Sequence, residues 1–106
     1  MILDDIVKKS IDRIKSDMKI GFPISFGYKD IESYYGKCYF YKRHITLQTS
    51  LAKYNIKYIL SVIYHECAHF YYHDHQEGFY SLLEGVFPGY KRTQHELRMT
   101  KYREFF

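Results

Sequence analysis

The sequence contains 106 residues, of which 46% are hydrophobic and 26% are charged, with 13 tyrosines, 8 phenylalanines and no tryptophan. This length and composition predict a single globular domain over residues 1–106 and exclude a disordered or fibrous chain. No run approaches the roughly 18 consecutive apolar residues of a membrane span and no secretory signal is recognisable, so we expect a soluble cytoplasmic protein. The net charge of +4 leaves acidic partners, nucleic acid included, open.

The first predicted element is an amphipathic helix over residues 2–18, where apolar residues recur at intervals of three and four. Gly21 and Pro23 end this pattern. Residues 22–28 then alternate between apolar and small or polar side chains, which predicts a half-buried strand. Strand-forming side chains at 39–41 and 45–48 flank three polar residues and predict a hairpin.

The next predicted element is a helix that begins after Asn55, a residue type that commonly caps helix N-termini. Its apolar stripe would pack against the sheet and consists of Ile59, Leu60, Ile63, Cys67 and Phe70. Asp74 and Glu77 have the spacing of a capping box and predict another helix, as do Thr93 and Glu96. The predicted fold is therefore α+β, with an N-terminal helix, a small antiparallel sheet that includes the hairpin, and several helices in the C-terminal half.

The segment HECAHFYYHDH, residues 65–75, contains an HExxH motif within the helix that follows Asn55. His65 and His69 lie about 40° apart around a helix axis and one turn apart along it, so both imidazoles can bind one ion. Glu66 lies about 100° from His65, where it reaches a metal-bound water without binding the metal itself. This arrangement is typical of hydrolytic zinc sites, in which the ion activates a water and the glutamate acts as general base.

A catalytic zinc site usually has three protein ligands and one open position. The candidates for the third ligand are His73, Asp74, His75, Glu77, Glu84 and His95. On a continuous helix His75 would project about 120° away from His69 and could not share the ion. A helix that ends near His73 and restarts at Asp74 would place His75 in the first turn of the second helix, folded back toward the ion. We therefore predict His65, His69 and His75 as metal ligands and Glu66 as the catalytic residue.

The remaining histidines and the cysteines have simpler interpretations. A histidine at a helix end, as predicted for His73, more often satisfies a carbonyl or interacts with the helix dipole than binds a metal. His44 and His95 receive the same non-ligand interpretation. Cys67 lies on the core side of its helix, where a small buried hydrophobe is expected, and it and Cys38 are expected to be reduced.

Two further regions have a predicted role outside the metal site. The strand over residues 45–48 is a candidate edge for pairing with an extended substrate, or it only packs against the helix. Residues 91–106 contain five basic and two acidic residues, which permits contact with nucleic acid. A solvated helix that packs Leu97, Tyr102 and Phe105 against the core is the simpler interpretation of that segment. An oxyanion stabiliser is expected, but none of the 13 tyrosines stands out for it.

Five stretches read, in this order, YGKC, ITL, HECAH, DHQEGFY and FPGYK, and they span residues 35–91. This series resembles the YgjP-like family of zinc metallopeptidases, which shows W-G-x-C, I-x-L, HELxH, N-H-x-x-x-F-W and L-P-x-Y-K elements. The resemblance implies a zincin-like fold in which the three histidines bind zinc and the glutamate of HECAH is catalytic. Tyr35 and Tyr80 stand where the family prefers Trp, and Asp74 replaces Asn. SprT-like and WLM-type peptidases, some of which act on DNA-bound proteins, look like relatives, although the zinc ribbon of SprT-like repair proteases is absent.

The sequence thus predicts a small zinc-dependent metallopeptidase that acts as a monomer on peptide or protein substrates. Two alternatives remain open. A non-catalytic zinc-binding module would be favoured by a fourth protein ligand such as Cys38, Asp74 or Glu84, because structural zinc sites are generally closed. A DNA-associated protease is the other alternative, and it would require salt-dependent binding to DNA.

Overall fold

The computed structural model describes the backbone of residues 2–104 and the side chains of residues 2–99. The elements are α1 (Ile2–Met18), β1 (Ser25–Lys29), β2 (Gly36–Tyr39), β3 (His44–Gln48), α2 (Ile56–Ala68), α3 (Glu77–Val86) and α4 (Tyr90–Glu104), with 3-10 turns at Phe40–Lys42 and Thr49–Lys53. The predicted α+β class and the predicted N-terminal helix are confirmed. The last helix begins at Tyr90, earlier than the predicted start near Thr93.

The three strands form one sheet in the order β1-β3-β2. The prediction of a hairpin is confirmed, because β2 pairs antiparallel with β3, with Cys38 opposite Ile45. The predicted position of its first strand, residues 39–41, is wrong, because β2 ends at Tyr39 and Phe40–Lys42 forms a 3-10 turn. The prediction that the whole sheet is antiparallel is wrong, because β1 pairs parallel with β3, with Phe26 opposite Ile45. The chain crosses from β1 to the far edge before the hairpin returns β3 between the two strands. β3 is therefore the central strand, and the prediction that residues 45–48 form a substrate-binding edge is wrong.

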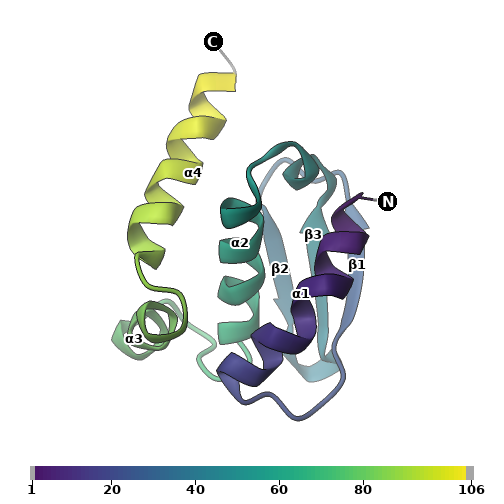
Figure 1. Cartoon of the computed structure of the whole chain (residues 1–106), viewed down its shortest axis with the longest axis vertical. Helices are drawn as coiled ribbons and strands as arrows, with labels where there is room; N and C mark the ends of the chain where they lie inside the picture. The colour runs from purple at the N-terminus through teal and green to yellow at the C-terminus, as the bar shows by residue number, and fades with distance from the viewer. Residues whose placement is uncertain (1, 105–106) are drawn as a thin grey trace.

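The core lies between the sheet and two helices, since α1 and α2 pack against the same face of the sheet (Figure 1). The period of two along β3 directs Ile45 and Leu47 into this layer, where both are fully buried. The helices contribute Leu3, Val7, Ile14 and Met18 from α1 and Ile59, Ile63 and Cys67 from α2. Each large aliphatic side chain in this layer contributes roughly 1.5–3 kcal/mol by leaving water.

The N-terminus of α2 is fixed by a cap. The Asn55 side chain accepts a hydrogen bond of 3.0 Å from the Lys57 backbone N–H, so the predicted N-cap is confirmed. The other end of the helix is tied to α1, because the Tyr64 hydroxyl donates to Asp17 Oδ2 at 2.7 Å. α2 is thereby held along the sheet with its last turn next to β2 and α3.

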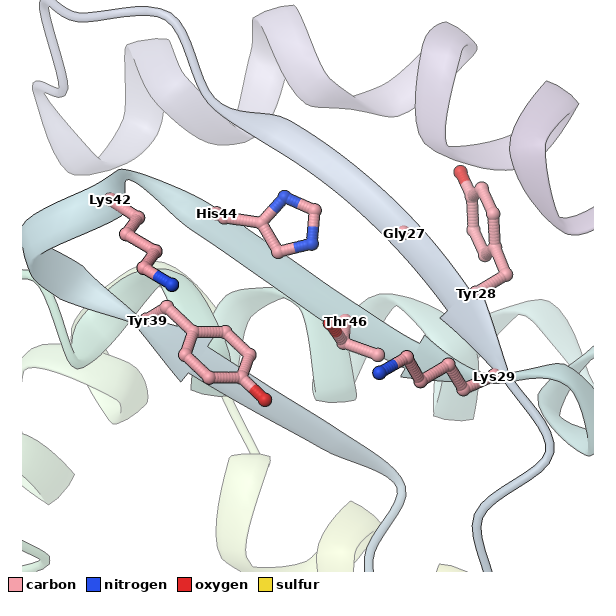
Figure 2. A pocket seen from close by; sticks show the side chains of 7 residues that line it. All are labelled: Gly27, Tyr28, Lys29, Tyr39, Lys42, His44 and Thr46. Atoms are coloured by element: carbon pink, nitrogen blue, oxygen red, sulfur yellow. The ribbon is translucent and has the colours of Figure 1, made fainter.

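The opposite face of the sheet carries no helix among the described residues (Figure 1). A groove of about 350 Å³ lies on this face. In Figure 2, Tyr39 and His44 lie at its sides, and the side chains of Lys42 and Lys29 point toward its middle from opposite ends. The His44 ring is held over β1 by a 2.7 Å hydrogen bond between its Nδ1 and Ser25 Oγ. His44 therefore lies on the sheet face away from α2, in line with its predicted non-ligand role.

Over the described residues, none of the helices is long and apolar enough to cross a membrane.

Candidate metal centre

α2 places the first two histidines of the HExxH motif on one side of its C-terminal turn. His65 lies in the last turn and His69 is the C-cap residue, and their ring centroids are 5.0 Å apart. The four-residue spacing brings the two rings together because it corresponds to one helical turn. Both rings also contact Phe79 of α3, which is fully buried beneath them.

The chain reverses direction immediately after His69. α2 ends at Ala68, four residues before Tyr72, so FYYH forms turns and bends rather than the predicted end of the helix. The Tyr72 carbonyl accepts a hydrogen bond from His69 Nδ1 at 3.0 Å, which stabilises this reversal. The helix therefore ends earlier than the sequence suggested.

His75 comes back to the first two histidines by this reversal. Its Nε2 lies 3.3 Å from His65 Nε2 and 3.1 Å from His69 Nε2. The predicted cap at Asp74 is wrong, because α3 begins at Glu77, Gln76 is its N-cap, and the side chain of that residue makes no capping hydrogen bond. His75 thus lies in the connecting loop, before the first turn of α3.

The three Nε2 atoms fit a single metal ion. At metal–nitrogen bond lengths of roughly 2.0–2.1 Å, two ligands of a tetrahedral zinc are about 3.3 Å apart, close to the separations of His75 Nε2 from its two neighbours. Ligand atoms of all three residues lie within 4.8 Å of one another. His69 donates from Nδ1 to the Tyr72 carbonyl, which leaves its Nε2 lone pair for a ligand bond. The residues present therefore fit a metal with nitrogen ligands.

Tyr90 orients His65 from the outer side of the ring. His65 Nδ1 and the Tyr90 hydroxyl are hydrogen-bonded, and a metal-binding His65 donates its Nδ1 proton to the tyrosine oxygen. Tyr90 is 1% exposed and is the first residue of α4, directly after Gly89, which has the left-handed φ of 81°. Sequence reasoning gave Tyr90 no role. The signal available in the sequence was Pro88-Gly89-Tyr90, because proline and glycine separate two helices and place the tyrosine at the start of the second.

Burial keeps His65 in the form that binds metals. Removal from water, and secondarily the neighbouring His69 and His75, lower the pKa of His65 to about 3. Burial is also the main cause that lowers the pKa of His69, although its hydrogen bond to the Tyr72 carbonyl acts in the opposite direction. Neutral imidazoles are required for coordination, so these shifts reduce competition by protons.

Glu66 is the buried carboxylate of the site. It is 5% exposed, and its Oε2 lies 3.9 Å from His65 Nε2. Burial raises the pKa of Glu66 to about 8, in the range required of a proton acceptor and donor near neutrality. A cation at the histidines would lower this pKa by favouring the charged carboxylate.

The close approach of β2 to Glu66 depends on a glycine. A Cβ added to Gly36 would lie 3.0 Å from Glu66 Cγ and 3.2 Å from Val62 Cγ1. A contact of 3.0 Å is tighter than nine in ten real Cβ contacts, so a larger residue at this position would require the side chains of Glu66 and Val62 to shift by a few tenths of an ångström. The glycine of the YGKC stretch therefore has a packing role at the site.

A cleft of about 450 Å³ lies over the three histidines and Glu66. Its remaining lining consists of Tyr34, Gly36, Lys37, Cys38, Phe40 and His73. β2 is an edge strand of the described sheet, and its residues Gly36, Lys37 and Cys38 line this cleft. His73 stacks on Phe40 at a centroid distance of 3.7 Å and is not part of the ligand group.

The other predicted roles divide as follows. Among the described side chains, only the three predicted histidines form a group with the spacing of metal ligands; Cys38, Asp74 and Glu84 are outside it. Cys67 is fully buried, as predicted for a core residue, and both cysteines are free thiols. Leu97 is fully buried, whereas the predicted core contacts of Tyr102 and Phe105 fall outside the described side chains.

The fold and the site together define a small metallopeptidase domain. The chain belongs to the family described as "YgjP-like, metallopeptidase domain", which matches residues 2–100. The family membership suggested by the five ordered sequence stretches is therefore confirmed.

Two solved structures have a similar fold. The metallopeptidase zymogen of Pyrococcus abyssi abylysin has a TM-score of 0.79 and 21% sequence identity, and the match covers 96% of this chain and 96% of that chain. The metallopeptidase zymogen of Methanocaldococcus jannaschii jannalysin has a TM-score of 0.74 and 18% identity, with 100% of this chain and 99% of that chain covered. No curated protein matches the chain at a significant level.

Proposed function

We propose that the protein is a zinc-dependent peptidase in which His65, His69 and His75 hold the ion and Glu66 transfers protons. The observation that carries this proposal is the convergence of three Nε2 atoms beside one buried carboxylate. A zinc ion bound there would supply a water of lowered pKa and polarise the carbonyl of the scissile peptide bond.

The roles of the protein groups follow from their positions. Tyr90 and the Tyr72 carbonyl fix the rings of His65 and His69 through their Nδ1 atoms, so both Nε2 lone pairs point into the cleft. Glu66 accepts a proton from the attacking water and later donates it to the amine nitrogen of the leaving group. Burial raises the pKa of Glu66, and a cation at the histidines would lower it, so the two effects oppose each other at this carboxyl group.

We further propose that β2, rather than β3, pairs with an extended substrate. β2 borders the cleft, and within the described residues it pairs on one side only, with β3. An extended peptide would pair with the free backbone groups of Gly36–Tyr39 and lie across the three histidines. The short strand and its glycine keep this path open beside Glu66.

The alternatives have less support. A closed structural zinc site needs a fourth protein ligand, and the group among the described side chains has three members. Association with DNA stays a prediction that rests on the basic composition of residues 91–106. The two free thiols, Cys38 and Cys67, favour a reducing compartment such as the cytoplasm. We also propose that the peptidase acts as a monomer.

The decisive experiment compares zinc content and peptide cleavage in the wild type and in Glu66→Gln. The variant should retain the ion, because Glu66 is outside the ligand group, and lose hydrolysis by at least about 100-fold, because general acid–base catalysis contributes roughly 10²–10⁴ in rate. Glu77→Gln, an exposed change in the first turn of α3, is the matched control and should cleave normally. Cleavage by Glu66→Gln at the wild-type rate would exclude the proposed role.

A further inference from the structure

A second pocket adjoins the metal centre, and the proposed mechanism does not use it. It has a volume of about 310 Å³ and lies between α3 and α4. Its lining consists of His65, Tyr80, Tyr90, Lys91, Gln94 and Arg98. His65 lines both this pocket and the cleft over Glu66, so a peptide that crosses the metal centre passes next to the pocket.

The pocket is positively charged. Lys91, Gln94 and Arg98 recur at intervals of three and four, which places them on one face of α4. Among the described side chains, neither Lys91 nor Arg98 forms an ion pair, and no carboxylate lines the pocket. Two cations that form no ion pair with any described side chain, in a concave site beside His65, are suited to an anionic group of a ligand.

The neighbouring groups hold this arrangement in place. Lys91 Nζ lies 5.1 Å from the centroid of the Tyr80 ring, which positions the ammonium at the pocket. Gln94 Nε2 donates to Ser61 Oγ of α2 at 2.9 Å, which ties this face of α4 to the active-site helix. Glu66 and Glu84, the two carboxylates whose charges contribute to the raised pKa of Tyr90, both lie outside the pocket lining.

We propose that this pocket binds a carboxylate of the substrate, so that the peptidase prefers peptides with an acidic group at one fixed position near the scissile bond. This inference rests on the proposed function, because it assigns the substrate class of the same site. Arg98 can bind both carboxylate oxygens through its planar guanidinium, and Lys91 adds a point charge. The carboxylate comes either from an Asp or Glu side chain or from the C-terminus of the peptide.

The first experiment measures kcat/KM of the zinc-loaded protein on a set of amidated peptides in which Glu or Gln occupies each position in turn. Glu at one position should raise kcat/KM about tenfold over Gln, the size expected for two partly exposed charge pairs. Added salt should reduce this ratio because exposed charges are screened. A parallel set with free C-termini distinguishes the two sources: a gain confined to the free acids assigns the pocket to the terminal carboxylate.

The same ratio is then measured in three variants. Arg98→Gln and Lys91→Gln should each lower the Glu/Gln ratio toward one, since each removes a cation of the pocket. Arg92→Gln is the matched control, because Arg92 neighbours Lys91 on α4 and is exposed but does not line the pocket, and its ratio should equal that of the wild type.

A second measurement separates this inference from the proposed function. The zinc-loaded Glu66→Gln variant, with and without Arg98→Gln, is titrated with the Glu and Gln peptides in a calorimeter. Cleavage without any preference for a carboxylate, or with a preference unchanged by Arg98→Gln, overturns the inference and leaves the peptidase function intact. If the wild type cleaves no peptide, the proposed function fails, and the calorimetric binding data alone test the anionic pocket. Tighter binding of the acidic peptide that is lost with Arg98→Gln then supports the anionic pocket, and equal binding of both peptides overturns it.

Discussion

Glu66→Gln should stabilise the metal-free protein at neutral pH, even though the proposed mechanism predicts that this variant loses catalysis. Burial raises the pKa of Glu66 from 4.5 to about 8 in the folded chain. A raised pKa of this kind gives stability that is fully present below pH 4.5 and is lost as the pH rises toward 8, because unfolding releases a proton over that range. Glutamine is neutral in both states, so the variant does not lose this contribution.

The size of the effect follows from the two pKa values. With 1.36 kcal/mol per pKa unit, the free energy of unfolding of Glu66→Gln should exceed that of the wild type by about 1 kcal/mol at pH 5, ~2 kcal/mol at pH 6 and ~3 kcal/mol at pH 7. Any constant difference in packing between Gln and Glu adds the same amount at every pH. The rise of roughly 2–3 kcal/mol between pH 5 and pH 7 is therefore the part that belongs to the carboxyl group.

Urea denaturation in the presence of a chelator, followed by circular dichroism at pH 5, 6 and 7, measures this difference. Glu77→Gln, which changes an exposed carboxylate, should show no such dependence on pH. A difference between wild type and Glu66→Gln that stays constant from pH 5 to pH 7 would refute the argument, because it would mean that the folded protein holds Glu66 ionised without a metal.

Three further substitutions test the geometry of the centre. Tyr90→Phe keeps the aromatic ring but removes the hydroxyl that accepts from His65 Nδ1, so zinc affinity should fall about 10- to 100-fold. Competition with a chromophoric chelator measures this affinity, and an unchanged value would show that the hydrogen bond does not orient the His65 ring. His75→Ala should abolish stoichiometric zinc binding, whereas His73→Ala, two residues away, should bind one equivalent by elemental analysis; equal zinc content in the two variants would contradict the ligand assignment. Gly36→Ala should destabilise the fold by about 1–3 kcal/mol and lower kcat, because the added Cβ would lie 3.0 Å from Cγ of Glu66, the proposed general base. A wild-type melting temperature and a wild-type rate would show that the strand and the Glu66 side chain adjust without cost.

The helical parts of the fold follow from local sequence. The period of apolar residues and the Asn55 cap predicted α1 and the start of α2 because both signals act within a few residues. The direction of β1 had no such signal, since alternation of side chains gives the faces of a strand but neither its neighbours nor its polarity. The antiparallel prediction failed there, and the assignment of the edge strand failed with it.

The approach of His75 to His65 and His69 was predicted from a correct requirement but with the wrong local structure. The requirement was that α2 end before His75, and it ends at Ala68 with no glycine or proline at the break. The reversal is held by contacts remote in sequence: the Tyr71 hydroxyl donates to the carbonyls of Met18 and Lys19, at 2.7 and 2.8 Å, more than 50 residues away. Such contacts are invisible to local reasoning, and so was the hydrogen bond between Tyr90 and His65.

The shortness of β2 sets a condition on the proteins that such an enzyme attacks. Four residues of strand span about 13 Å, and pairing along them requires a partner whose own backbone groups are unpaired over the same distance. Segments inside a folded sheet or helix do not meet this condition until they open locally, and the free energy of that opening is added to the cost of binding. Substrates should therefore be ranked by how readily a four-residue stretch unfolds, so that tails, linkers and damaged or unfolded chains are cut first and intact domains persist.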